Sequence, residues 1–242
     1  MPMIIDSATV SHEGNHRQHN EDAYFVSQEK GVWCVADGMG GYAAGEVASA
    51  QVVQAVASTP IDGVLEDTLN AVAASLHDVN DNMVQAEKQG LQPAMGSTVL
   101  VLLVQGNNSG CLWAGDSRLY LYRDALLYQM SKDHSLVQEW ADQGVISPQE
   151  MDNHPRGHVI TRAVGAGPDL ELDRIYFELQ PMDQLLLCSD GLYNELSPEE
   201  ISAALGLHES LQAKAEYLMQ QVLLKEARDN VTISILQCCD AL

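Results

Sequence analysis

Basic residues are scarce in this chain, in which 12 lysines and arginines stand against 34 aspartates and glutamates over 242 residues. The resulting net charge of −22 excludes a broad basic surface of the kind that binds nucleic acids or anionic membranes without specificity. The surface as a whole also repels any ligand that carries a phosphate. We therefore expect bound cations or an individual arginine to supply the attraction for such a ligand.

Long apolar runs and a disulfide pattern are missing as well. The longest apolar run, residues 99–104, is far shorter than the roughly 20 residues of a membrane-spanning helix. The first basic residue is Arg17, so the N-terminal region lacks the charged start of a secretory signal peptide. Three of the five cysteines lie inside apolar segments, and Cys238 and Cys239 are adjacent at a strand end, where a structural role is expected. We expect a soluble, cytoplasmic protein that does not insert into membranes.

Helical patterning is strongest over residues 62–89, where apolar side chains recur at alternating steps of four and three. A coiled-coil seam has the same spacing, but about three heptads favour a helix that faces a protein core. Further helices are expected at residues 43–58 and 136–143, from 147, from 197 and at 211–222.

Apolar segments bounded by turns predict strands at residues 4–10, 23–36 (two strands around a turn), 99–105, 110–114, 118–123, 126–130, 172–179, 184–189 and 231–236. The short turns between residues 99 and 130 favour antiparallel neighbours, because parallel strands need long crossover connections. The chain is long enough for one domain with an ample core. We predict a single domain over residues 1–242 with an α+β, antiparallel, layered fold.

Acidic residues recur where these strands begin or end. Asp37 follows the apolar run 32–36 and precedes a glycine turn that includes Gly38 and Gly41. Alone, an Asp-Gly pair after a strand is ordinary turn chemistry. The same arrangement returns, however, at Glu21 with Asp22, Asp116, Asp190 and Asp229. Gathered carboxylates repel one another unless cations lie between them, and oxygen ligands favour Mg²⁺ or Mn²⁺ over zinc.

Eight short motifs follow one another along the chain: Arg17-x-x-Asn20-Glu21-Asp22; Asp37-Gly38-Met39-Gly40-Gly41 with Gly45-Glu46; Gly96-Ser97-Thr98; Gly115-Asp116-Ser117-Arg118; Asp133-His134-Ser135; Ile160-Thr161-Arg162-Ala163-Val164-Gly165; Ser189-Asp190-Gly191; and Asp229-Asn230. In order and approximate spacing they resemble the metal-dependent type 2C (PPM) serine/threonine protein phosphatases, in their bacterial single-domain form. The resemblance covers residues 5–236. It implies a four-layer α-β-β-α sandwich, with two antiparallel sheets flanked by helix pairs, and Mn²⁺- or Mg²⁺-dependent hydrolysis of phosphoserine and phosphothreonine in proteins.

The resemblance also implies six metal ligands: the bridging Asp37, Glu21 and the carbonyl of Gly38 on one ion, Asp190 and Asp229 on a second, and Asp116, which shares a third, weaker ion with Asp190. Two residues are implied to be catalytic. Asp22 would hydrogen-bond a water at the metals, and Arg17 would bind the substrate phosphate.

The chemistry of such a site is coherent on its own. Two divalent ions about 3.5–4 Å apart can acidify a water and clamp the oxygens of an in-line displacement at phosphorus, and Arg17 can pair with the remaining phosphate oxygens. Cys34 and Cys188 lie close to the acids in sequence, but no Cys-x₅-Arg phosphate loop accompanies them. We therefore expect no cysteine nucleophile.

One position departs from many eukaryotic members of the family. Met39 stands where they have a histidine proposed as the general acid, as is common in the bacterial branch. A water at the metals is our first choice for the proton donor, and His154 or His158 in the segment 133–168 is the alternative, unless both are solvent-exposed loop residues. The resemblance identifies this segment with the family's flap beside the active site. Arg156 and Arg162 would contact the phosphoprotein there, or else form structural ion pairs.

Two other functions compete with an active phosphatase. A catalytically silent relative that binds a partner would have lost metal ligands, and none of the acids is missing. A metal nuclease or small-molecule phosphoesterase would use similar chemistry, but the acidic charge opposes a nuclease. Short bacterial members usually oppose a membrane serine/threonine kinase, in some cases one that controls a secretion apparatus. The resemblance thus implies phosphoproteins, a cognate kinase and its substrates as partners of a monomeric enzyme, and no nucleic acid.

Overall fold

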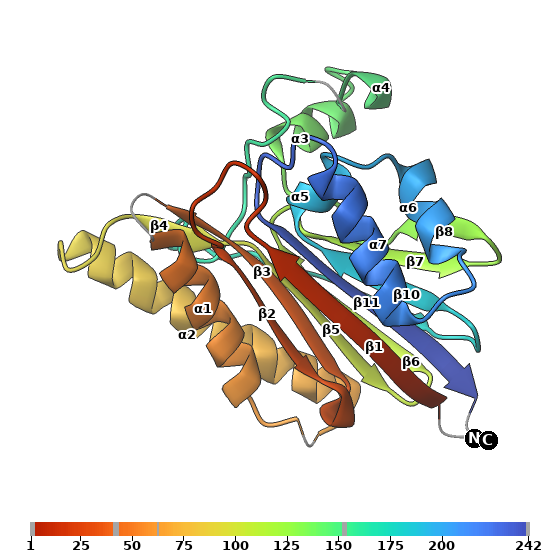
Figure 1. Ribbon diagram of the computed structural model, residues 1–242. Coiled ribbons are helices and arrows are strands. Elements are labelled where there is room, and N and C mark those ends of the chain that lie inside the picture. Colours follow the sequence, from red (N-terminus) through yellow and green to blue (C-terminus); the bar gives the residue numbers. More distant parts are fainter. Residues whose placement is uncertain (1–2, 41–43, 62, 152–153, 241–242) are drawn as a thin grey trace.

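Two antiparallel sheets lie face to face in the computed structural model, which describes residues 3–40, 44–61, 63–151 and 154–240 (Figure 1). The five-stranded sheet has the order β1-β11-β10-β7-β8, with strands β1 Met3–His12, β7 Arg118–Arg123, β8 Leu126–Gln129, β10 Gln184–Cys188 and β11 Val231–Asp240. The six-stranded sheet has the order β2-β3-β5-β6-β9, with β4 paired to β3; its strands are β2 Asp22–Ser27, β3 Val32–Gly40, β4 Met95–Ser97, β5 Val99–Gln105, β6 Asn108–Ala114 and β9 Asp173–Glu178. The antiparallel pairing predicted from the short turns is confirmed.

Helices cover the outer face of each sheet. The six-stranded sheet carries α1 Ala44–Ser58 and α2 Leu65–Lys88, and the five-stranded sheet carries α5 Asp190–Tyr193, α6 Pro198–Leu205 and α7 Leu211–Leu223. Two short helices, α3 Leu136–Asp142 and α4 Pro148–Met151, lie at one end of the sheets, uppermost in Figure 1, and the 3-10 turn η1 is Gln28–Lys30. None of the helices in the described ranges combines the length and apolar character needed to cross a membrane.

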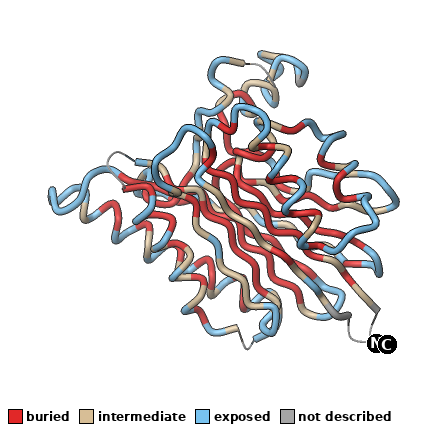
Figure 2. The backbone as a smooth tube through the Cα atoms, in the orientation of Figure 1, coloured by how far each residue is buried: buried red, intermediate tan, exposed pale blue. Residues whose placement is uncertain are grey.

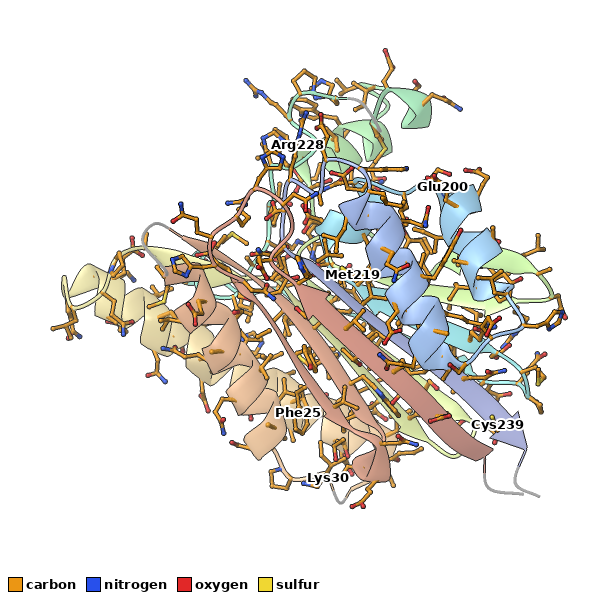
Figure 3. The ribbon with its side chains drawn as sticks, in the orientation of Figure 1. Phe25, Lys30, Glu200, Met219, Arg228 and Cys239 are labelled. Atoms are coloured by element: carbon orange, nitrogen blue, oxygen red, sulfur yellow. The ribbon has the colours of Figure 1, made fainter. Side chains whose placement is uncertain are left out.

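Three apolar cores separate the four layers. Side chains of α1, α2 and the six-stranded sheet form one outer core, and those of α5 to α7 with the five-stranded sheet form the other. Phe25 and Met219, labelled in Figure 3, pack against these two cores. The third core lies between the sheets around Trp33 and Leu185. The central strands β3, β5, β6 and β10 are buried along most of their length, as Figure 2 shows, whereas the edge strands β8 and β9 are partly exposed. The predicted α-β-β-α sandwich is confirmed.

Local chemistry accounts for most element boundaries. The apolar stripe of α2 is buried, including Leu69 and Leu76, and α6 begins at the predicted serine, where Ser197 and Glu200 form a reciprocal capping box. Cys34 and Cys188 are buried free thiols, as expected.

Two predictions about the strand ends were wrong. The strand at Asp37 does not end there, because Gly38 to Gly40 continue β3 and pair with β4. The glycines were mistaken for a turn because their role in letting strands approach closely depends on the partner, which is distant in sequence. Helix α5, which starts at Asp190, was not expected either. The predicted turn residue Gly41 and the predicted helix start at residue 43 lie outside the described residues.

Candidate metal centre and catalytic site

The strand ends next to which the predicted acidic residues lie are at the end of the sandwich beneath α3 and α4 (Figure 1). The six-stranded sheet contributes Glu21 before β2, Asp37 within β3 and Asp116 after β6, while the five-stranded sheet contributes Asp190 after β10 and Asp229 before β11. Residues that are up to 208 positions apart thus meet because antiparallel strands bring their opposite ends to one edge. Neither sheet alone supplies the whole set.

Asp37 lies at the centre of this cluster. It stands directly opposite Asp22 in the β2–β3 register, a position where like charges destabilise a strand pair. Burial, followed by the charges of Asp22 and Asp190, raises its pKa well above the ordinary value. The pKa of Asp190 is also raised well above its usual range, first by burial and then by Asp116 and Asp229. The cluster therefore needs protons or cations to be stable.

Asp22 joins the two sheets at the site. Its Oδ2 accepts hydrogen bonds of 2.7 Å each from the hydroxyls of Ser189 and Thr232, which belong to the opposite sheet. Its Oδ1 is buried and accepts no hydrogen bond. Burial raises the pKa of Asp22 to about 6, although the two hydroxyls act against this shift. Sequence reasoning named Asp22 but missed both hydroxyl partners.

The loop after β6 holds Asp116, which is buried with an Oδ1 that lacks a hydrogen-bond partner. Burial, followed by the charge of Asp133, raises its pKa to about 7. The hydroxyl of Tyr193 donates to the Asp116 carbonyl at 2.9 Å. Asp190 accepts from Asn194 through Oδ2 at 3.0 Å and likewise keeps a buried, unpaired Oδ1.

Glu21 is fixed through its backbone. Its N–H donates to Asn230 Oδ1 at 2.8 Å, and its carbonyl accepts from the Ser49 hydroxyl at 2.6 Å and from the Gly38 N–H at 3.1 Å. Asn230 also donates to the carbonyls of residues 13 and 19, so this side chain holds the whole loop before β2. The sequence indicated Asn230 only as part of the motif Asp229-Asn230 and did not predict these contacts.

Two glycines allow this close packing. A Cβ on Gly38 would lie 2.0 Å from the Gly45 carbonyl oxygen, and a Cβ on Gly45 would lie 2.8 Å from Glu21 Cδ and Oε1. Any side chain at either position would push α1 away from the loop that carries Glu21. The glycines therefore bring the carboxyl group of Glu21 and the Gly38 backbone to one place.

Arg17 lies at the edge of the cluster. Its Nη2 donates to Asp229 Oδ2 at 2.8 Å, and this hydrogen bond raises the pKa of the arginine. Its side chain is about half exposed. The arginine predicted to bind phosphate is therefore next to a predicted metal ligand and open to solvent.

The donor set of the cluster fits hard divalent cations. It consists of oxygens alone, which Mg²⁺ and Mn²⁺ prefer, and three buried carboxylate oxygens, those of Asp22, Asp116 and Asp190, have no hydrogen-bond partner. The shell is not pre-formed, because no three histidine, cysteine, aspartate or glutamate side chains among the described residues are grouped tightly enough to hold an ion.

Some residues of the segment 133–168 make contacts within the protein, and others line a cleft next to the acidic cluster. Arg162 pairs with Asp173 at 2.9 Å and with Glu171 at 3.5 Å, which matches the structural alternative. His154 packs edge-on against Trp140, 5.3 Å between ring centroids. His158 lines a cleft together with Asp116 and Asp190, so it is the better placed of the two histidines.

The sequence of this chain is similar to those of known protein phosphatases. A family model described as "Protein phosphatase 2C" matches residues 10–226. The chain belongs to this family. The serine/threonine protein phosphatase PstP of Mycobacterium tuberculosis is 36% identical over 239 residues, 98% of this chain but 46% of PstP, so the chain spans about half the length of that relative. The serine/threonine phosphatase Stp of Listeria monocytogenes is 33% identical, covering 93% of this chain and 92% of Stp.

Solved structures of the family have the same fold. PppA, described as a key regulatory component of the T6SS in Pseudomonas aeruginosa, has a TM-score of 0.90 and 38% identity over 98% of this chain and 99% of its own. The catalytic domain of PstP in complex with two manganese ions has a TM-score of 0.86 and 36% identity over 98% of this chain and 100% of its own. This protein phosphatase 2C homologue thus shares its α+β architecture with a relative that binds two Mn²⁺ ions.

Proposed function

We propose that this chain is a metal-dependent protein serine/threonine phosphatase, organised as one catalytic domain over residues 1–242. The observation that carries the proposal is the cluster of acids at the junction of the two sheets, with Arg17 at its edge. Membership of the protein phosphatase 2C family supports it. The substrates would be phosphoserine and phosphothreonine residues of proteins.

The cluster would hold two Mn²⁺ or Mg²⁺ ions and a third, weaker one. We assign as ligands Glu21, Asp37, the Gly38 carbonyl, Asp116, Asp190 and Asp229. Bound ions of this kind lower the pKa of a water and stabilise the charge that develops on the phosphoryl group during in-line displacement.

The chain's own residues would orient the reactants. Arg17 reaches Asp229 and is half exposed, so its guanidinium can pair with the phosphoryl oxygens as a substrate enters. Asp22 uses Oδ2 for Ser189 and Thr232, which leaves Oδ1 free to accept a hydrogen bond from the attacking water. Without cations, burial raises the pKa of Asp22 to about 6, and bound cations would favour its ionised, hydrogen-bond-accepting form.

A covalent cysteine intermediate is not part of this proposal. Burial raises the pKa of Cys34 and of Cys188 to about 12, so neither thiol is ionised at neutral pH and neither is an effective nucleophile. Direct attack by water remains the route that these residues support. The proton for the leaving alkoxide would come from water or from His158, which lines the adjoining cleft.

The cellular setting that we propose is a reducing cytoplasm, because all five cysteines are free. The partners would be a cognate serine/threonine kinase and its phosphorylated substrates, with the enzyme acting as a monomer. Similarity to PppA, described as a T6SS regulator, supports a kinase that controls a secretion apparatus.

Hydrolysis of a phosphothreonine peptide by the purified protein tests the proposal. Activity should disappear in EDTA and return with Mn²⁺ or Mg²⁺. Asp37→Asn should abolish it, whereas Asp81→Asn, the same change at an exposed site on α2, should not. Absence of activity with every metal would favour a catalytically silent binding module instead, and full activity of Asp37→Asn would overturn the ligand assignment.

A further inference from the structure

A cleft of about 380 Å³ opens directly from the acidic cluster, with Asp116 and Asp190 at its inner end. Residues of the segment 133–168, including Val137 and Met151, form one wall, and residues that follow α5, including Leu196, form the other. A phosphorylated residue held at the cluster would place its neighbours in the cleft, since two extended residues span about 7 Å.

Arg118 and Asp133, which both line the cleft, form an ion pair without net charge. Arg118 makes hydrogen bonds of 2.6–3.1 Å to both carboxylate oxygens of Asp133, and its guanidinium lies 3.5 Å from the centre of the Tyr193 ring. Tyr193 in turn holds the backbone of Asp116. Because Asp133 already uses the charge of Arg118, this arginine is not available to an acidic side chain of a ligand.

The wall after α5 carries a carboxylate that has no ion-pair partner among the described residues. Glu195 lines the cleft, and among the described residues it forms no ion pair. Lys225 pairs with Glu200 at 2.9 Å and donates to the backbone carbonyl, not the carboxylate, of Glu195 at 2.5 Å, and the guanidinium of Arg228 pairs with Glu226. The backbone N–H of Arg228 donates to Glu195 Oε1 at 3.3 Å, which leaves the charge of the carboxylate in place.

We propose that this cleft binds a lysine or arginine side chain of the phosphoprotein, next to the phosphorylated residue, and that Glu195 pairs with it. This inference rests on the proposed phosphatase function. Apolar walls around Val137, Met151 and Leu196 suit the aliphatic stem of such a side chain, and a carboxylate suits its charged end. A glutamate of the substrate would meet an unpaired like charge, so the enzyme would discriminate against it.

Hydrolysis of matched phosphothreonine peptides in Mn²⁺ tests this. The peptides differ only in carrying arginine, glutamine or glutamate at one of the two positions on either side of the phosphothreonine. At one of these positions the wild-type enzyme should prefer arginine over glutamine by about three- to fivefold in kcat/KM, the range of a partly exposed ion pair. The preference should appear mainly in KM and shrink between 50 and 300 mM salt.

Two variants separate the role of Glu195 from a general effect. Glu195→Gln keeps the acceptor for Arg228 and should reduce the arginine preference to less than twofold, without changing hydrolysis of the glutamine peptide or of para-nitrophenyl phosphate. Glu199→Gln removes an exposed charge on α6 that does not line the cleft and should retain the preference. Equal kcat/KM for all peptides, or an unchanged preference in Glu195→Gln, would overturn this inference alone. If no peptide is hydrolysed with any metal, the proposed function itself fails.

Discussion

Replacement of Asp37 by asparagine should stabilise the protein in EDTA, although it should abolish activity. Asp37 faces Asp22 across the β2–β3 pair, and burial together with the surrounding carboxylates raises its pKa well above the ordinary value. At pH 8 the metal-free wild-type protein must therefore either hold like charges close together or bind a proton at Asp37, and both cost free energy. Asparagine has nearly the same shape and removes the charge at the centre of the cluster.

The size of the effect follows from the register. Side chains directly opposite on antiparallel strands have Cβ atoms about 5 Å apart, and two unit charges at this distance repel by about 3 kcal/mol at an effective dielectric constant of about 20. In a chain of this length, 1 kcal/mol shifts Tm by about 2–4 °C. The variant should thus melt about 6–12 °C above wild type in EDTA.

Mn²⁺ should stabilise the wild-type protein but not the variant. At 100 times its Kd, a ligand of the native state contributes about 2.7 kcal/mol, so the wild-type Tm should rise by about 5–10 °C. Asp37→Asn lacks one of the carboxylates that we assign as metal ligands, and its Tm should hardly change.

Thermal unfolding followed by circular dichroism at pH 8, in EDTA and across a Mn²⁺ titration, measures both quantities. Asp81→Asn, on the exposed face of α2, is the matched control and should resemble wild type in both conditions. A variant that melts below wild type in EDTA would refute the repulsion on which this reasoning depends.

Three further predictions concern the same site. In EDTA, the free energy of unfolding should fall as pH rises from about 5 to 8. The raised pKa values of Asp22 (about 6) and Asp116 (about 7) mean that the folded protein binds more protons than the unfolded chain in this range. Urea titrations at several pH values measure this, and a free energy of unfolding that rises with pH would contradict it. Asn230→Ala removes a side chain that makes three hydrogen bonds to the loop before β2, so the free energy of unfolding measured in urea should fall by roughly 2–4 kcal/mol. The Mn²⁺ affinity measured by calorimetry should weaken as well. An unchanged affinity would show that this loop does not position the metal ligands. Arg17→Ala should raise KM for a phosphopeptide about tenfold or more, while Mn²⁺ still raises the Tm of the variant. Loss of this Mn²⁺-dependent rise in Tm would show that Arg17 supports metal binding rather than phosphate binding.

The sequence predicted well those features that depend on local patterns. The stripe of α2 and the serine cap of α6 are recognisable because neighbours three or four residues apart share a helix face. Features that depend on distant partners could not be found this way. The strand β3 continues past Asp37 only because β4 pairs with its glycines, and whether Arg162 meets a substrate or Asp173 depends on where β9 lies.

The acidic residues themselves, and the preference of such oxygen donors for Mg²⁺ or Mn²⁺, were determined by the sequence alone, because they are properties of residue type. Only the tertiary structure decided how they are used. It places Asp22 between Ser189 and Thr232 of the opposite sheet, and it leaves Glu195 without an ion-pair partner among the described residues, in a cleft next to the cluster. Burial and charge proximity arise from the packing of two sheets, and no local pattern in a sequence encodes which distant strand ends that packing will join.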